Sequence, residues 1–177
     1  MKIKKTRFKD LLIIKQKDNK DSRGSLKETF NYKILKKKFV FEYCTTSKKN
    51  VLRGFHFQTK FKQSKYVNVV KGRILDVVID LRKKSKTFGK SFKIILSKEN
   101  SLGLYIPAGF AHAYYSYDKE NIIYYKLDNY YAPKFESGII YNDPTLKIKW
   151  PKKKMKVSQK DKNLLTIEEF KKKFKAL

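Results

Sequence analysis

The sequence of 177 residues predicts an all-β fold, a barrel or a sandwich, that occupies residues 1–177 as one domain. Short stretches rich in Val, Ile, Tyr and Phe recur along the chain, with residues typical of turns between them. The composition does not change from end to end, and no internal repeat or low-complexity linker marks a domain boundary. Helix is therefore expected to be a minor element.

Strands are expected wherever such a stretch occurs. These stretches are residues 11–14, 39–43, 51–58, 66–70, 73–81, 92–96, 104–106, 113–117, 122–127 and 138–141. In 73–81, Leu75, Val77 and Ile79 share one face, whereas Asp76 and Asp80 share the other. This period of two is typical of a sheet whose two sides differ.

A few short helices are expected, and the clearest of them lies near the C-terminus. Thr166 and Glu169 have the spacing of a capping box, in which each side chain bonds the backbone N–H of the other residue. Phe170, Phe174 and Leu177 then form an apolar stripe. We expect this helix to pack against the rest of the domain.

The net charge of +28 would, taken alone, indicate a phosphate-rich partner such as nucleic acid. Only five of the 44 basic residues are arginine, however, and the lysines are scattered through every segment. Proteins that read nucleic acid favour arginine because its planar group bonds two acceptors at once. We therefore expect no nucleic-acid partner, and keep a basic binding module as the non-enzymatic alternative.

The single cysteine, Cys44, cannot form an internal disulfide, so nothing indicates an oxidising compartment. The apolar run at residues 11–14 is too short for the core of a signal peptide, and no later run approaches the length of a membrane span. We expect a cytoplasmic protein without a membrane partner.

Two histidines, His56 and His112, are the first candidates for chemistry. Strict alternation along residues 51–58 would place His56 on one face with Leu52 and Gln58, and Gly54 would remove bulk beside the imidazole. That arrangement suits a histidine that faces a pocket. A lone histidine in a strand is more often a structural group, so the surrounding sequence has to decide.

The segment from Gly103 to His112, which contains Pro-Ala-Gly-Phe-Ala-His, resembles the second motif of the cupin superfamily. Metal-binding cupins also carry a His-x-His pair, and here the corresponding residues are His56-Phe57-Gln58. Two imidazoles cannot hold a metal in the usual way. We therefore expect no catalytic metal, and chemistry by acid and base side chains.

A longer series of motifs resembles the dTDP-4-dehydrorhamnose 3,5-epimerase family, in the same order and over nearly the whole chain. The motifs are Asp21-Ser-Arg-Gly24, Asn50-Val-Leu-Arg-Gly-Phe-His-Phe-Gln58, Val77-Val-Ile-Asp-Leu-Arg82, Ser85-Lys-Thr-Phe-Gly89, Ile106-Pro-Ala-Gly-Phe-Ala-His112, Tyr130-Tyr-Ala-Pro133 and Asn142-Asp-Pro144. The resemblance implies a cupin jelly-roll barrel, usually a homodimer. Its implied activity is cofactor-independent inversion of C3 and C5 in a nucleotide-linked 4-keto sugar, for bacterial surface polysaccharides.

The resemblance also implies roles for individual residues. His56 matches the family's base, Asp161 the carboxylate that orients it, and Tyr125 the proton donor on the opposite side of the sugar. Lys65 matches the lysine near the ketone, with Lys60 and Lys62 as rivals. The positions that match substrate contacts are Arg23, Glu28, Arg53, His112, Tyr131, Glu136 and Lys160.

The chain departs from the family pattern before the first histidine strand. The dTDP-rhamnose enzymes carry Gln-Asp-Asn there, whereas this chain has Phe41-Glu42-Tyr43. Two amides are replaced by aromatic rings, so the sugar or the nucleotide is expected to be held differently. Relatives that act on GDP-linked heptoses, or that invert C3 alone, stay open as alternatives. A cupin 3,4-ketoisomerase of similar sugars is the enzymatic rival.

Overall fold

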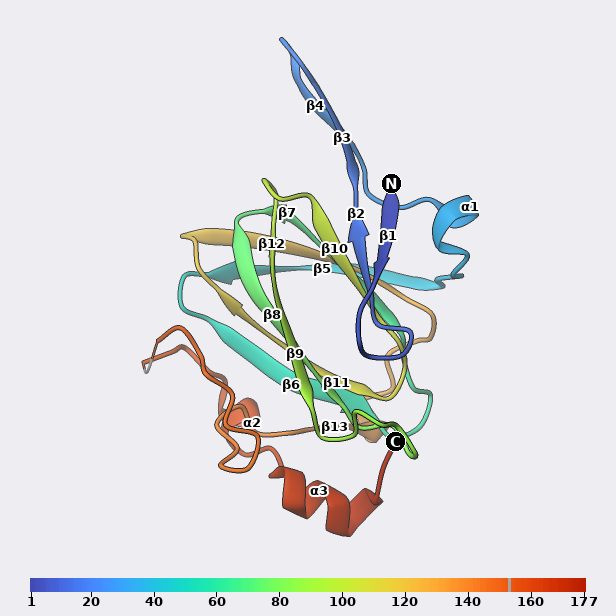
Figure 1. The fold of residues 1–177 in the computed structure, drawn as a ribbon. Helices are drawn as coiled ribbons and strands as arrows, with labels where there is room; N and C mark the ends of the chain where they lie inside the picture. The colour runs from blue at the N-terminus through green and yellow to red at the C-terminus, as the bar shows by residue number, and fades with distance from the viewer. Residues whose placement is uncertain (153) are drawn as a thin grey trace.

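The computed structural model describes residues 1–152 and 154–177 as two facing antiparallel sheets (Figure 1). The first sheet has the order β1 (Lys2–Lys5), β2 (Leu12–Lys15), β10 (Leu102–Ile106), β7 (Lys65–Lys71), β12 (Glu120–Leu127) and β5 (Phe41–Lys48). The second has the order β13 (Glu136–Gly138), β6 (Leu52–Gln58), β11 (Phe110–Ser116), β8 (Arg73–Asp80) and β9 (Ser91–Ser97). The predicted cupin-type jelly roll is confirmed, as two open sheets.

The remaining elements surround the two sheets. A separate hairpin, β3 (Lys17–Asp21) with β4 (Gly24–Glu28), projects away from them at the top of Figure 1. The helical segments are α1 (Tyr32–Leu35), the 3₁₀ turn η1 (Pro133–Phe135), α2 (Gln159–Lys162) and α3 (Ile167–Phe174). None of the helices in the described ranges is long and apolar enough to cross a membrane.

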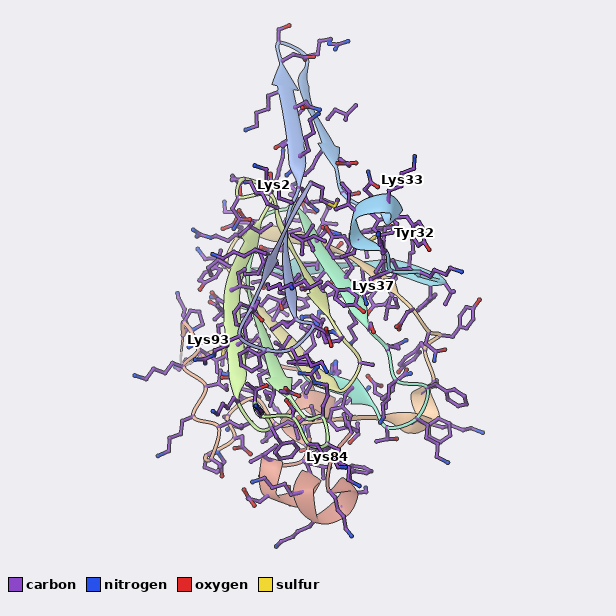
Figure 2. All side chains as sticks on the ribbon, turned by 45° about the vertical axis from the view of Figure 1, so that its right-hand side comes forward. Lys2, Tyr32, Lys33, Lys37, Lys84 and Lys93 are labelled. Carbon is purple, nitrogen blue, oxygen red and sulfur yellow. The ribbon has the colours of Figure 1, made fainter. Side chains whose placement is uncertain are left out.

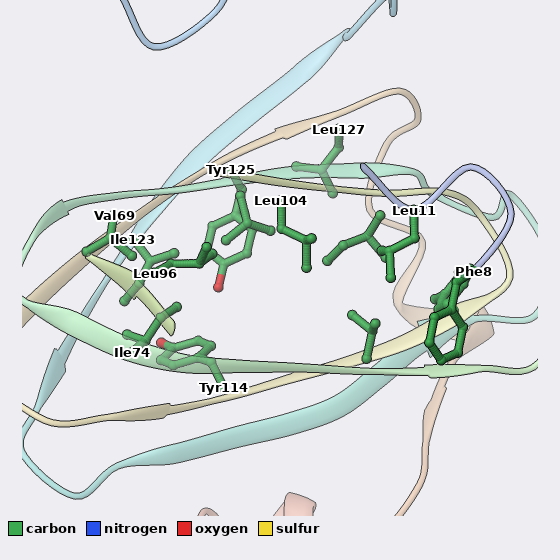
Figure 3. Packing of buried hydrophobic residues seen from close by; sticks show 14 residues of the cluster. Phe8, Leu11, Val69, Ile74, Leu96, Leu104, Tyr114, Ile123, Tyr125 and Leu127 are labelled. Atoms are coloured by element: carbon green, nitrogen blue, oxygen red, sulfur yellow. The ribbon is translucent and has the colours of Figure 1, made fainter. Parts of the chain in front are cut away.

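The main core fills the space between the two sheets, as Figure 3 shows. Ile123, Tyr125 and Leu127 point inward from β12, and Ile74 and Tyr114 meet them from β8 and β11. Alternation along β12 puts the neighbouring tyrosine and lysine on the opposite, more exposed side. The inward face predicted for Tyr125 is thus confirmed, and the chain brings a phenol into the interior.

A second core lies on the outer side of the five-stranded sheet, where α3 packs. Phe170 is fully buried there against Phe57, and Phe174 and Leu177 complete the apolar stripe. Both hydrogen bonds of the capping box between Thr166 and Glu169 are present. Because α3 covers one face of β8 and the other sheet covers its opposite face, Asp76 and Asp80 are buried as completely as the apolar residues beside them.

The strands predicted from sequence are mostly present, with three differences. The last predicted strand, 138–141, is shorter and earlier, because beyond Gly138 the chain makes only an isolated bridge from Ile139 to Leu165. Strand β5 extends beyond 43 through polar residues to Lys48. Strand β1 and the hairpin β3–β4 were not predicted, because their lysine-rich segments lack alternating apolar residues.

The lysines are spread over the molecule. In Figure 2 the labelled lysines lie far apart, from Lys33 near α1 to Lys84 toward the end that carries α3. This distribution agrees with a general lysine bias in the composition.

Candidate active site

A cavity of about 190 Å³ opens between the two sheets and gathers five of the eleven candidate residues, including both histidines. It is lined by Tyr43, Thr45, Arg53, His56, Lys65, His112, Tyr114 and Tyr125. A larger cavity of about 570 Å³ lies elsewhere, lined by residues of 7–10 and 82–87. That larger cavity contains neither a histidine nor a tyrosine, so we place the candidate active site in the smaller one.

His56 lies on β6 and contacts a carboxylate that is distant in sequence. Its Nε2 lies 2.7 Å from Oδ1 of Asp161. The second oxygen of Asp161 accepts the backbone N–H of Gly54 at 3.1 Å. Burial opposes ionisation of Asp161, but the hydrogen bonds and charge of His56 and the Gly54 N–H hold its pKa below the usual value. Asp161 is therefore an anion that fixes the imidazole.

The position of Asp161 depends on the short helix α2. Ser158 caps this helix, and its Oγ accepts the backbone N–H of Asp161 at 3.1 Å. The helix lies against β6, which brings the carboxylate to the histidine. A local cap thus sets a contact between residues that are 105 positions apart.

The strand that carries His56 contains a bulge, and this changes the face predicted by simple alternation. His56 pairs with His112 and Arg53 pairs with Tyr114, so two residues of β6 lie opposite one residue of β11. His56 and Arg53 therefore line the same cavity. Leu52 turns to the other side, and the prediction that it shares a face with His56 is wrong because alternation does not continue through a bulge.

Gly54 makes the bulge possible. Its φ is +111°, and a Cβ atom there would lie 2.4 Å from the carbonyl oxygen of His112 and 2.7 Å from the Cα of Ala113. A side chain would therefore force the two histidine strands apart. The sequence reason given for this glycine, removal of bulk beside the imidazole, was incomplete.

His112 forms a second histidine–aspartate pair deeper in the molecule. Its Nε2 lies 2.8 Å from Oδ2 of Asp76, and both side chains are almost completely buried. The other carboxylate oxygen of Asp76 is buried without a hydrogen-bond partner among the described residues. The pair thus brings a buried carboxyl group next to a histidine that lines the cavity.

Tyr125 reaches the cavity from the opposite sheet. Its ring lies edge-on to the His112 ring, with centroids 6.1 Å apart, and stacks on Tyr43, with centroids 4.8 Å apart. Burial and the neighbouring Tyr114 and Tyr43 raise the pKa of Tyr125 well above that of an ordinary tyrosine. Its hydroxyl is therefore a neutral proton donor on the side opposite β6.

Lys65 lies in the lining of the cavity. Burial lowers its pKa to about 8, and the negative charges of Glu136 and Asp76 only partly oppose this shift. Lys60 instead lies over the ring of Phe135, 5.3 Å from its centroid, and Lys62 is exposed outside the cavity lining. Of the three lysines considered from sequence, Lys65 alone lines the cavity.

Three of the substrate-contact candidates form one cluster beside strand β6. Glu136 pairs in register with Gln58 and accepts hydrogen bonds from Tyr131 at 2.7 Å and from Lys160. Burial opposes ionisation of Glu136, but the bonds from Lys160 and Tyr131 hold its pKa below the usual value. The structure thus brings Tyr131, Glu136 and Lys160 together, close enough to His56 for its charge to act on Glu136.

The other predicted contacts divide into two groups. Arg53 lines the cavity and donates through Nε to Oγ of Ser47 at 3.1 Å. Arg23 lies on the projecting hairpin, where its side chain is 89% exposed and pairs with Asp21 at 2.7 Å. Glu28, at the base of the hairpin, accepts a hydrogen bond from Asn31 at 2.6 Å. The chain therefore does not bring Arg23 and Glu28 into its own cavity lining.

The cavity also contains residues that the sequence interpretation did not select. Tyr43, Thr45 and Tyr114 line it, and Tyr114 exchanges hydrogen bonds with Ser47 at 2.8 Å and Thr45 at 3.1 Å. Tyr114 lies two residues after His112, so alternation could have found it. Asp76, which orients His112, was noted only for its place in the strand pattern.

No metal site is found in the described part of the chain. Among residues 1–152 and 154–177, no group of three or more His, Cys, Asp or Glu side chains could hold a metal ion. The two imidazoles each bond a carboxylate through Nε2. The cavity lining itself supplies groups that can act as a base, an acid and cations.

The chain is similar to known proteins over nearly its whole length. Residues 5–169 match the family model described as dTDP-4-dehydrorhamnose 3,5-epimerase. An epimerase of that name from Methanothermobacter thermautotrophicus is 39% identical, over 93% of this chain and 94% of the relative. The Legionella pneumophila dTDP-6-deoxy-D-glucose-3,5-epimerase, solved with dTDP-4-keto-L-rhamnose, has a TM-score of 0.90 at 37% identity, covering 94% and 93% of the two chains.

A third relative is a 3'-monoepimerase from Streptomyces bikiniensis in complex with dTDP-quinovose. It has a TM-score of 0.89 at 26% identity and covers 94% of this chain and 88% of its own. The fold and the matches define an isomerase, an epimerase of the jelly-roll class. The chain belongs to the dTDP-4-dehydrorhamnose 3,5-epimerase family.

Proposed function

We propose that the protein inverts C3, or both C3 and C5, beside the C4 ketone of a nucleotide-linked 4-keto sugar. One observation carries the proposal: His56, which is paired with Asp161, and Tyr125 come from opposite sheets and line the same cavity. Inversion needs a base on one side of a sugar ring and an acid on the other. A 3,4-ketoisomerase moves the carbonyl, and this reaction depends less on a base and an acid on opposite sides of the ring.

His56 is the proposed base. Asp161 accepts the N–H at Nε2, which leaves Nδ1 as the basic nitrogen. Nδ1 takes the proton from C3, the electron pair of the C–H bond forms the enolate, and the carboxylate stabilises the imidazolium. This step needs no cofactor, because the adjacent ketone accepts the electrons.

Lys65 and His112 are proposed to face the negative oxygen of the enolate. Below about pH 8, Lys65 is a cation in a site where burial strengthens its charge interactions. His112, on β11 of the other sheet, is oriented by Asp76 and lines the same cavity. Both groups would stabilise charge that develops only as the proton leaves.

Tyr125 is the proposed acid. Its raised pKa keeps the phenol protonated, so it can deliver a proton to the face of the enolate opposite His56. The proton on His56 then passes to solvent, and solvent reprotonates Tyr125. Charge and protons balance, and the only net change is the configuration at carbon.

The size of the cavity indicates which part of the substrate enters it. Its volume of about 190 Å³ is below the ~300–1,000 Å³ typical of pockets that enclose a whole ligand. We propose that the keto sugar enters, with the diphosphate near Arg53 and Lys160 and the base near Tyr131. A relative from Bacillus anthracis solved with TDP and PPi, and the Legionella complex, support a dTDP-linked substrate.

A homodimer is proposed because two predicted contacts lie outside the cavity lining of their own chain. Arg23 and Glu28 lie on the projecting hairpin, whose Leu26 is 70% exposed. A second copy that received this hairpin would bury Leu26 and could obtain Arg23 for its diphosphate. Glu28 would then lie at the base of the shared segment.

We further propose that residues 1–177 act as one domain, in the cytoplasm, in the synthesis of bacterial surface sugars. Nucleic acid is not proposed as a partner. The lysines are dispersed along the chain, and the chain matches an enzyme family.

The test is incubation with dTDP-linked and GDP-linked 4-keto-6-deoxy sugars in deuterated water, followed by NMR at C3 and C5. Label at both carbons with inverted products supports a 3,5-epimerase, and label at C3 alone supports a 3-epimerase. A shifted carbonyl would support the ketoisomerase instead. Failure to label either carbon of any sugar, from folded protein, would refute the proposal.

A further inference from the structure

Tyr43 lines the cavity at a position where the sequence departs from the family pattern, and the proposed mechanism gives it no role. It lies on β5, the edge strand of the six-stranded sheet, directly opposite Tyr125 in the antiparallel register. The two rings are stacked, with centroids 4.8 Å apart and planes 22° from parallel. Directly paired residues on one face of a sheet are the closest cross-strand neighbours that a fold provides.

The stack confines the ring of Tyr125. The His112 ring on the other sheet meets it in an edge arrangement, with centroids 6.1 Å apart and planes 65° apart, and Tyr43 covers one of its faces. Among the described residues, β5 is the last strand of this sheet, so no further strand covers that side. On this side of Tyr125, Tyr43 covers the ring, while the side chain of Thr45 bonds the hydroxyl.

The support continues outward as a row of aromatic rings. Phe41 lies 5.7 Å from Tyr43, and Tyr130 lies 6.2 Å from Phe41, measured between ring centroids. Phe41 and Tyr43 are alternate residues on one face of β5, as the strand period requires. This row holds Tyr43 in place even though its side chain is 36% exposed at the edge of the sheet.

The hydroxyl of Tyr43 is unsuited to act as an anion. Burial and the neighbouring Tyr114, Glu136 and Tyr131 raise its pKa to about 12. At neutral pH it is therefore a neutral ring whose main contact with Tyr125 is through its face.

We propose that Tyr43 is a positioning residue that aims Tyr125 for proton delivery, and this inference rests on the proposed epimerase function. His56 can remove a proton and return a deuteron on its own face, which gives exchange without inversion. Inversion needs Tyr125 in the correct orientation. Loss of the Tyr43 ring should therefore separate the two processes, whereas loss of its hydroxyl should not.

The test compares Tyr43→Leu, Tyr43→Phe and wild type in deuterated water, measuring label at C3 and epimerised product in the same sample. Tyr43→Leu should keep the exchange rate within a few-fold while the product rate falls by about tenfold to a hundredfold, the scale that small misplacement of a reacting group produces. Tyr43→Phe should keep both the exchange rate and the product rate close to those of wild type. The matched control is Tyr124→Leu, since Tyr124 is on the outer side of β12.

Three results would overturn the inference. Tyr43→Leu could keep the wild-type ratio of product to exchange, which would mean that the stack does not aim Tyr125. Tyr43→Phe could lose product as strongly as Tyr43→Leu, which would assign the chemistry to the hydroxyl of Tyr43. Tyr124→Leu could separate the rates equally, which would make the effect a general one of the sheet. Absence of exchange in wild type would instead refute the proposed function.

Discussion

The two histidine–aspartate pairs have different surroundings, although their histidines lie side by side on paired strands. His56 and His112 are opposite each other in the register of β6 and β11. Their Nε2–carboxylate distances are nearly equal, 2.7 Å to Asp161 and 2.8 Å to Asp76. The His56 side chain is 29% exposed, whereas that of His112 is 5% exposed.

The carboxylates differ as much as the imidazoles do. Both oxygens of Asp161 accept hydrogen bonds, one from His56 and one from Gly54. One oxygen of Asp76 is buried and unpartnered among the described residues. A short histidine–aspartate contact therefore does not identify a base. Greater exposure of the imidazole and a fully satisfied carboxylate distinguish the His56 pair.

The largest difference in kcat is expected between the two variants in which one carboxylate is changed to an amide. Asp161→Asn should lower kcat by about 10²-fold or more, because an amide can no longer fix the tautomer of His56 or stabilise its cation. Asp76→Asn should lower kcat by less than about tenfold, because His112 does not take the proton. Steady-state kinetics on both variants, with folding checked by circular dichroism, measure the difference. Equal losses would remove the distinction between the pairs.

The next prediction concerns the bulge that separates the two histidine strands. Gly54→Ala should lower the free energy of unfolding by about 3 kcal/mol, because the new Cβ would clash with His112 and Ala113 in a strained backbone. The control is Gly89→Ala, where φ is also positive but no atom lies within 4 Å. It should cost about 1 kcal/mol. Urea denaturation measures both, and equal costs would show that the close approach of the strands is unimportant.

The sequence pattern predicts the strands but not the bulge, because the bulge depends on contacts between distant residues. Alternation correctly placed Tyr125 inward, and the capping box correctly placed the start of α3 after Thr166. Both patterns are local. The bulge at Gly54 depends on the close approach of β11, and the contact of Asp161 with His56 joins residues 105 positions apart. The resemblance alone pointed to Asp161, and its catalytic role stays a prediction.

The pH dependence of activity sharpens the comparison through Lys65, the cation that shares the cavity with both pairs. Burial lowers its pKa to about 8, so the cation predominates below that pH and is lost above it. The value of kcat/KM should therefore fall by about tenfold per pH unit above 8. Lys65→Arg should move this fall to higher pH, because a guanidinium stays charged. An unchanged profile in Lys65→Arg would mean that another group sets the limit.

The same shift makes a prediction about stability. The pKa of Lys65 in the folded state lies below its usual value of 10.5, so the folded state binds fewer protons than the unfolded state between pH 8 and 10.5. Lys65 should therefore oppose folding below pH 8 and cease to do so as the pH rises through that range. Lys65→Met should raise the free energy of unfolding at pH 7, as measured by urea denaturation.

The smallest effect is expected at the cap of α2. Ser158→Ala removes the acceptor for the N–H of Asp161 and should cost about 1 kcal/mol of stability together with a few-fold loss of kcat. Thr166→Ala removes the equivalent cap of α3, and should cost similar stability with no change in kcat. Equal kcat values in the two variants would show that α2 does not position Asp161 for catalysis.

The central claim is that His56, and not its neighbour His112, removes the proton from C3. The most direct measurement is the rate of deuterium entry at C3 in His56→Asn and His112→Asn, side by side with wild type. Here His56→Asn should show no entry above the uncatalysed rate, while His112→Asn should keep readily measurable entry. Persistent entry in His56→Asn, with loss in His112→Asn, would contradict the claim and assign the base to the buried pair.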